Sequence, residues 1–75
     1  MKDKIEQILL SAGFETEQIG EVDFIRMELL DSIMIAEIII GIEDGFGIEI
    51  DAEDIIPDNF RNVNTIINLV SRYTE

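Results

Sequence analysis

Residues 31–46 read DSIMIAEIIIGIEDGF, and this stretch decides the fold. It opens with a helix-start signal, because the side chains of Asp31 and Ser32 can both accept hydrogen bonds from unpaired backbone N–H groups of a first turn. The isoleucines at 38–40 would also suit a strand, since β-branched residues favour sheets. We reject a strand because the stretch is too long for one and ends in turn-forming Asp and Gly residues. The sequence therefore predicts a helix over residues 32–46.

At 100° per residue, this predicted helix has two distinct faces. The core face collects five apolar residues: Ile35, Ile38, Ile39, Ile42 and Phe46. The opposite face mixes acidic and apolar residues, and we call this face the docking surface. It consists of Ile33, Ala36, Glu37, Ile40, Glu43 and Asp44. Isoleucines beside carboxylates suggest contact with a partner, in which the acidic groups steer a basic protein and the apolar groups make close contact. The alternative is an over-hydrophobic helix that packs one flank on a loop.

The N-terminal part of the chain predicts a second main helix followed by a long loop. Residues 3–12 place apolar side chains at helical spacing, and Gly13 ends the pattern. From residue 14 to residue 30 the helical period is lost, although apolar residues recur among Glu and Asp. We expect a long loop that touches the core and holds at most one short helical turn. Such long connections are often functional.

The C-terminal part predicts a short helix and a last main helix. Residues 51–54 combine a capping residue with an acidic residue three positions later, and Pro57 stops this short helix soon afterwards. Asn62 caps the last helix, whose apolar stripe consists of Val63, Ile66, Ile67, Val70 and Tyr73. The predicted fold class is all-α: a small four-helix bundle with three main helices, one short helix and a long first loop.

Composition excludes several classes of function. The chain has 75 residues, 17 acidic against 5 basic side chains, a net charge of −12, and no His or Cys. Such a chain should be repelled by nucleic acids and anionic membranes, and it lacks the residues for a usual zinc site, a disulfide or a His-based nucleophile. An apolar content of 47% argues against disorder. We expect one domain over residues 1–75, monomeric and cytoplasmic, with no signal peptide and no membrane insertion.

Ser32 stands at the start of the predicted helix. Capping alone would explain a serine in this place. An anion attached to its hydroxyl, however, would lie at a helix N-terminus, where free N–H groups and the helix dipole favour negative charge. A phosphoryl group would therefore be tolerated there even in an acidic protein.

The Asp-Ser pair is part of a wider pattern. Leu30-Asp31-Ser32-Ile33 resembles the Asp-Ser-Leu attachment motif of acyl carrier proteins and of the related peptidyl and D-alanyl carriers, and Phe24 matches the family's loop phenylalanine. The acidic and exposed apolar positions of the family's second helix match five residues here: Glu37, Glu43, Asp44, Ile33 and Ile40. The second half is similar too, from the extended residues 46–50 through the acidic short helix to Asn62-Val63. The resemblance covers essentially the whole chain.

The resemblance implies a carrier rather than an enzyme. It implies that a phosphopantetheinyl transferase (holo-carrier synthase), supplying its own metal and base, attaches 4′-phosphopantetheine covalently to Ser32. Asp31 would shape the helix start and help the synthase to place its metal. The arm would end in a thiol that carries an acyl or aminoacyl group as a thioester. Further partners would be loading ligases and transferases with basic docking surfaces, and the absence of His then has a reason, because the carrier needs only an exposed hydroxyl.

Three positions depart from the fatty-acid type of carrier. Glu28 and Leu29 stand where many fatty-acid carriers have Leu-Gly, and Met34 replaces an acidic residue. Leu29 and the three residues that follow look closer to the D-alanyl and some stand-alone carriers. These differences leave family membership intact but keep the cargo open between fatty-acid, polyketide, nonribosomal and D-alanyl pathways.

Three other functions are alternatives to a carrier. In a calcium loop running from Glu43 to Asp54, positions 3, 5 and 6 would be Gly45, Gly47 and Ile48, so two ligands and the required glycine are lost. An unmodified acidic helical domain for protein–protein interaction uses the same face and differs only in lacking the modification. A self-contained enzyme is disfavoured because a small bundle offers no evident pocket that would perturb two carboxylates differently.

Overall fold

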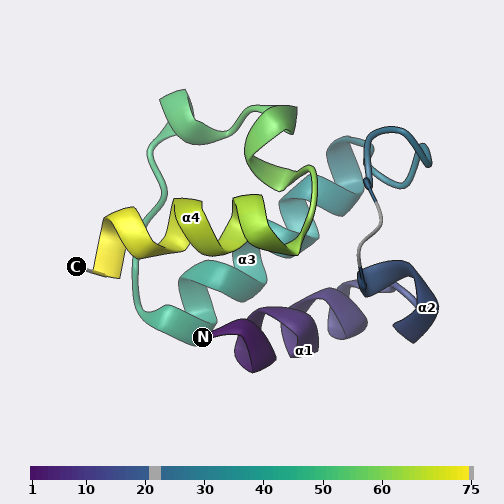
Figure 1. Cartoon of the computed structure of the whole chain (residues 1–75). Helices are drawn as coiled ribbons and strands as arrows, with labels where there is room; N and C mark the ends of the chain where they lie inside the picture. Colours follow the sequence, from purple (N-terminus) through teal and green to yellow (C-terminus); the bar gives the residue numbers. More distant parts are fainter. Residues whose placement is uncertain (21–22, 75) are drawn as a thin grey trace.

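The computed structural model describes residues 1–20 and 23–74, which form helices joined by loops (Figure 1). In chain order the elements are α1 (Lys2–Ala12), α2 (Thr16–Ile19), α3 (Ser32–Phe46), the 3-10 helices η1 (Ala52–Asp54) and η2 (Pro57–Phe60), and α4 (Val63–Thr74). These described ranges contain no strand, so the all-α prediction is confirmed. The isoleucines at 38–40, which would also suit a strand, are helical. Within them, no helix has both the length and the apolar character that a membrane crossing requires. Residues 21–22 of the predicted loop, and Glu75, lie outside the described residues.

The main helices begin and end where local sequence signals place them. Helix α3 spans the predicted residues, and α1 ends at Gly13, whose φ of 117° lies in the left-handed region that favours glycine. The Gly13 N–H donates to the Leu10 carbonyl at 3.1 Å. At the start of α4, the Asn62 side chain accepts from the Thr65 N–H at 2.9 Å, and the Thr65 hydroxyl accepts from the Asn62 N–H at 3.1 Å. Reciprocal capping thus fixes the last helix where the sequence predicts it.

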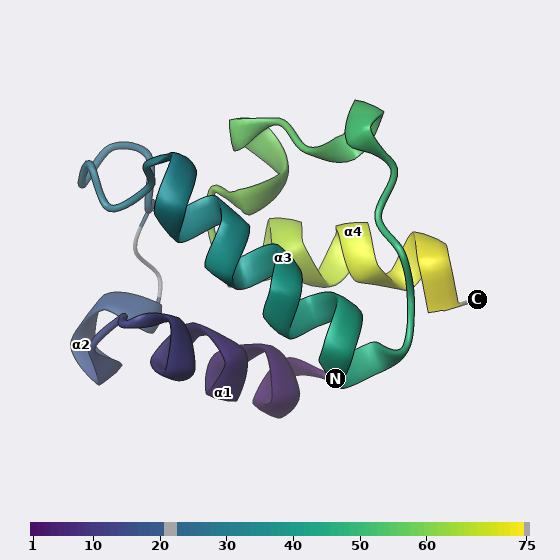
Figure 2. The same ribbon diagram turned by 180° about the vertical axis from the view of Figure 1, so that it is seen from behind.

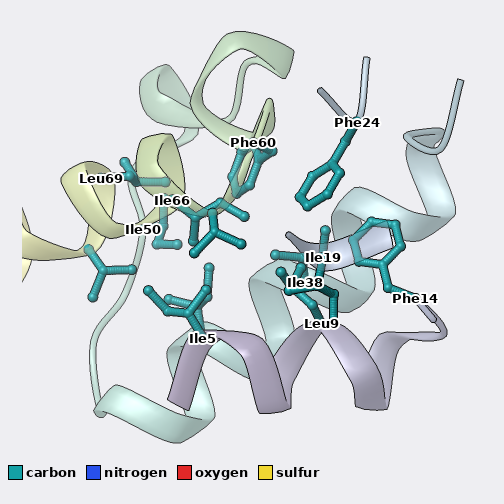
Figure 3. Close-up of a cluster of buried hydrophobic side chains, with 13 residues drawn as sticks. Ile5, Leu9, Phe14, Ile19, Phe24, Ile38, Ile50, Phe60, Ile66 and Leu69 are labelled. Atoms are coloured by element: carbon teal, nitrogen blue, oxygen red, sulfur yellow. The ribbon is translucent and has the colours of Figure 1, made fainter. Parts of the chain in front are cut away.

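Helix α1 packs against both α3 and α4, and α1 and α3 lie side by side in the view from behind (Figure 2). A single apolar core joins the elements, and ten of its side chains are labelled in Figure 3. Of the predicted core face of α3, Ile38 and Ile42 are fully buried, while the other three residues are partly buried and pack against the core. This face is therefore confirmed.

The loops contain more helix than the sequence suggests. The first loop holds α2, which agrees with the one expected turn, and Phe14, Ile19 and Phe24 from this region are buried in the core. Pro57 was predicted only to stop the short helix η1, but it is also the first residue of a second 3-10 helix, η2. Proline suits this position because the first N–H of a helix has no partner within the helix. In α4, Leu69 is fully buried although it was not part of the predicted stripe.

Candidate functional site

Ser32 is the first residue of α3, and its side chain is exposed. The preceding Asp31 has extended backbone, and its carboxylate Oδ1 accepts the N–H of Met34 at 2.7 Å. Of the two capping candidates, Asp31 therefore provides the cap. The exposed Ser32 hydroxyl makes no cap hydrogen bond, so a group can be attached to it without removing the cap.

The start of α3 favours an attached anion. Helix α3 is 15 residues long, and its dipole places partial positive charge at the end that carries Ser32. Residues 32–35 of the first turn carry no carboxylate, and the hydrogen bond from the Met34 N–H to the Asp31 carboxylate shows that this end of the helix already accepts a negative charge. Although the chain is strongly acidic, this end of α3 is locally suited to negative charge.

The loop before Ser32 is anchored in the core by aromatic packing. Phe24 is fully buried, and its ring centroid lies 4.7 Å from that of Phe14 at an interplanar angle of 31°. The Phe24 carbonyl accepts the N–H of Leu29 at 2.9 Å, which closes a tight turn. The backbone thus returns to the start of α3 from a fixed point, so Phe24 positions the loop that presents Ser32.

Polar contacts tie the same loop to the C-terminal half of the chain. The Asp23 carboxylate accepts the N–H groups of Ile25 and Arg26 at 3.0 and 3.1 Å, and its second oxygen accepts from Arg61 Nη1 at 2.9 Å. The Arg26 N–H and the Arg61 guanidinium hold the pKa of Asp23 below its usual value. The Arg61 carbonyl in turn accepts the Phe24 N–H at 2.6 Å. Arg61 therefore holds both the side chain and the backbone of the loop.

Sequence reasoning missed this anchor. Arg61 and Asp23 are 38 positions apart, and no local pattern pairs them. The one available signal was the presence of an arginine directly before the Asn62 cap in a chain with only 5 basic residues.

The turn between Phe24 and Leu29 contains Glu28 with φ of 57°, a left-handed conformation that non-glycine residues adopt only at a cost of about 1–3 kcal/mol. The position where a carrier of the fatty-acid type has leucine is thus strained here.

Five of the six residues of the docking surface are exposed, and the sixth is partly buried. Ile33 and Ile40 are 75% and 62% exposed, so the alternative that this flank packs on a loop is wrong. Ala36, Glu37 and Asp44 are exposed as well. Glu43 differs: it is partly buried, and its Oε2 accepts the N–H of Ile50 at 3.0 Å. One of its oxygens thus holds the segment after α3, so Glu43 lies at the edge of the docking surface.

The two ends of the calcium loop considered above are engaged by the chain itself. Glu43 accepts from Ile50, and Asp54 accepts from the Tyr73 hydroxyl, whose oxygen also accepts the Asp51 N–H at 2.9 Å. Among the residues that the structure describes, no three acidic side chains gather closely enough to hold a metal ion. The Asp54 carboxylate thus fastens η1 to α4, and the Glu43 carboxylate holds the segment between α3 and η1.

Comparison with known families decides between a carrier and the rival interaction domain. The family described as "Phosphopantetheine attachment site" matches residues 3–70. The chain belongs to this family. Its members are non-catalytic carriers that bear 4′-phosphopantetheine covalently and that interact with phosphopantetheinyl transferases and biosynthetic enzymes. No curated protein and no solved structure gave a significant match.

The start of α3 fits this prosthetic group. A phosphopantetheine arm is joined through an anionic phosphodiester, which requires an accessible hydroxyl and a site that accepts negative charge. Ser32 is exposed, the cap is made by Asp31, and the helix N-terminus offers a favourable dipole. The first turn of α3 therefore meets both requirements.

Proposed function

We propose that Ser32 is the attachment residue and that the chain carries an acyl or aminoacyl group to partner enzymes. The observation that carries this proposal is the exposed serine at the first position of a 15-residue helix whose cap is provided by its neighbour. The Leu30-Asp31-Ser32-Ile33 motif supports the same residue. When bound, the arm supplies a terminal thiol that holds the cargo as a thioester.

Modification requires little of this chain beyond position. In the transfer from coenzyme A, the bond from Ser32 Oγ to phosphorus forms, a P–O bond of the pyrophosphate breaks and 3′,5′-ADP leaves. The hydroxyl proton passes to a base on the transferase. Asp31 holds the first turn so that Oγ projects outward, and the anchored loop keeps the approach to it constant. The helix dipole favours the phosphodiester that results.

The docking surface provides the encounter with basic partners. Its exposed carboxylates, Glu37 and Asp44, lie beside the exposed Ile33 and Ile40 on the helix that begins with Ser32. A net charge of −12 accelerates association with a basic surface and makes the rate depend on salt. Loading ligases and transferases would use the same surface. In the same proposal, residues 1–75 act as one cytoplasmic, monomeric carrier domain.

Intact-mass measurement tests the attachment residue. The chain is incubated with coenzyme A and a broad-specificity phosphopantetheinyl transferase, and we expect a gain of one phosphopantetheinyl group. Ser32→Ala should abolish the gain, whereas Ser11→Ala, which removes another exposed serine, should retain it. A wild-type chain that gains no mass would instead support the unmodified interaction domain.

Charge reversal tests the docking surface. Glu37→Lys and Asp44→Lys should each slow modification at low salt while leaving the melting temperature nearly unchanged, because both side chains are exposed. High salt should narrow the difference. Equal modification rates for the variants and the wild type at low salt would refute the role of these carboxylates.

A further inference from the structure

The segment before the proposed attachment serine, residues 23–29, is a closed turn rather than an open loop. The backbone N–H groups of residues 24–29 all donate hydrogen bonds. The Asp23 carboxylate accepts from residues 25 and 26, and the carbonyls of residues 23–25 accept from residues 27–29 at 2.9 to 3.0 Å. The last two of these bonds, donated by Glu28 and Leu29, form the pattern that closes many helices with a left-handed residue, usually glycine. The segment is thus one helical turn, capped at both ends, that stops shortly before Ser32.

Glu28 occupies the left-handed position of this turn, at φ of 57°. Glycine adopts this conformation freely, whereas a residue with a Cβ does so at a cost. The Glu28 side chain is exposed, so its own burial does not offset that cost. Such a conformation persists only where the surrounding structure determines it. The turn therefore depends on the contacts that hold it in place.

Two hydrogen bonds join the turn to the C-terminal half of the chain, and both end at Arg61. Its guanidinium donates to Asp23 Oδ2 at 2.9 Å, and its carbonyl accepts the N–H of Phe24 at 2.6 Å. The other terminal nitrogen of the guanidinium donates to Asp58 of η2 at 2.8 Å. Because Arg61 directly precedes the Asn62 cap of α4, the turn is fastened to a fixed point of the bundle.

We propose that Asp23 and Arg61 are positioning residues for phosphopantetheine attachment at Ser32. Their ion pair keeps Glu28 in its left-handed conformation, and the closed turn fixes the direction from which the chain enters α3. Without the pair, the turn opens at Glu28, and the first turn of α3, in which Asp31 is the cap and Ser32 presents its hydroxyl, frays. The inference rests on the proposed function and adds to it a pair of residues outside the docking surface.

Two aspartates that both bind Arg61 provide a matched test. Asp23→Asn leaves one oxygen, which cannot serve both the backbone N–H groups of the turn and the Arg61 guanidinium. Asp58→Asn removes the same charge and also an ion pair with Arg61, but at an exposed residue of η2 that is not part of the turn. The rate of modification is measured in single turnovers with a broad-specificity phosphopantetheinyl transferase in excess, as a function of transferase concentration.

Asp23→Asn should lower the rate at saturating transferase about fivefold, because misplacing a reacting group by about 1 Å already slows a reaction markedly. The transferase concentration at half-saturation should change by less than about twofold, since the docking surface is intact. A merely structural role would do the reverse, because a smaller folded fraction weakens apparent binding but leaves the saturated rate unchanged. Asp58→Asn should keep both quantities within about twofold of the wild type. Arg61→Gln, which shifts the net charge in the opposite direction, replaces Asp23→Asn if melting curves show that the latter is unfolded.

Relief of the strain at Glu28 tests the link to the turn. Glu28→Gly in the Asp23→Asn background should recover much of the lost rate, because glycine adopts the left-handed conformation without steric cost. Glu28→Gln removes the same charge but keeps the strain, so it should not recover the rate. Equal rates for Asp23→Asn and Asp58→Asn, a change confined to half-saturation, or equal effects of Glu28→Gly and Glu28→Gln would overturn the inference while Ser32 is still modified. A wild-type chain that gains no phosphopantetheinyl group would overturn the proposed function itself.

Discussion

Gly41 and Gly45 lie one helical turn apart on the side of α3 that faces α1, yet alanine should be less favourable at Gly41 than at Gly45. Replacing glycine by alanine inside a helix favours folding by about 1 kcal/mol at either site. At Gly45 the new Cβ would lie 3.4 Å from Ile8 Cδ1 and 3.5 Å from Lys4 Cε, which are ordinary contacts. Gly45→Ala should therefore be neutral or stabilising by up to about 1 kcal/mol.

At Gly41 the same Cβ would lie 2.6 Å from Ile8 Cγ2. This is about 1 Å closer than a favourable carbon–carbon contact. The Ile8 methyl group is attached to a branched Cβ with one strongly preferred rotamer in a helix, so it cannot easily move aside. Overpacking of this kind costs about 1–3 kcal/mol. After the helix propensity gain, Gly41→Ala should be neutral to destabilising by about 2 kcal/mol.

Thermal unfolding followed by circular dichroism measures the contrast. For a domain of this size, 1 kcal/mol corresponds to about 4–8 °C, so Gly41→Ala should melt at least about 4 °C below Gly45→Ala. In an Ile8→Val background, which keeps the Cγ2 methyl group, Gly41→Ala should still destabilise the fold. In an Ile8→Ala background, which lacks this methyl group, Gly41→Ala should cost much less stability. If Gly41→Ala melted at or above Gly45→Ala, α1 and α3 would not pack as closely at Ile8 as described.

Three further predictions concern the cap, the core and the C-terminal contact. Asp31→Ala should cost about 1 kcal/mol by removing the helix cap, and Asp31→Asn should keep most of it, as thermal melts would show; equal losses in the two variants would exclude capping as the reason. Phe24→Ala should cost about 3–5 kcal/mol, a large part of the usual stability of a domain, and a melting temperature near the wild-type value would contradict its place in the core. The pKa of Tyr73 is raised because its hydroxyl donates a hydrogen bond to the Asp54 carboxylate. This hydrogen bond therefore stabilises the fold fully below the pKa of a tyrosine in the unfolded chain, about 10, and the stabilisation is lost as the pH rises through the higher pKa of the folded chain. Ultraviolet titration of this single tyrosine should give a higher midpoint in the native than in the denatured chain and a lower one in Asp54→Asn; identical midpoints would disprove the contact.

Much of the fold was predictable because its signals are local. The cap at Asp31, the glycine after α1 and the cap at Asn62 each act within a few residues, and the structure has them where the sequence predicts them. The 3-10 helix η2 was missed because proline both interrupts and begins helices, and the residue order near Pro57 does not distinguish the two effects.

The candidate site was predictable only in part. The serine and the mixed face of α3 follow from helical periodicity and from the resemblance to carriers. How far each residue of that face is exposed depends on its neighbours in space, and the hydrogen bond from Ile50 to Glu43 joins residues that no local pattern pairs. The anchor formed by Asp23 and Arg61 depends on two segments that are distant in sequence and close in the fold.

By itself, the sequence determined the span of α3, the end of α1 and the start of α4, together with the strong negative charge, the lack of His and Cys, and the placement of a serine at a helix start. These properties need only composition and interactions within one or two turns. Only the tertiary structure decided that the loop before Ser32 is held by Phe24 and Arg61, and that α1 meets α3 at Gly41 to leave a groove beside Glu37. The physical reason is that packing between helices depends on the approach of surfaces far apart along the chain, where one missing Cβ at Gly41 changes the contact by about an ångström.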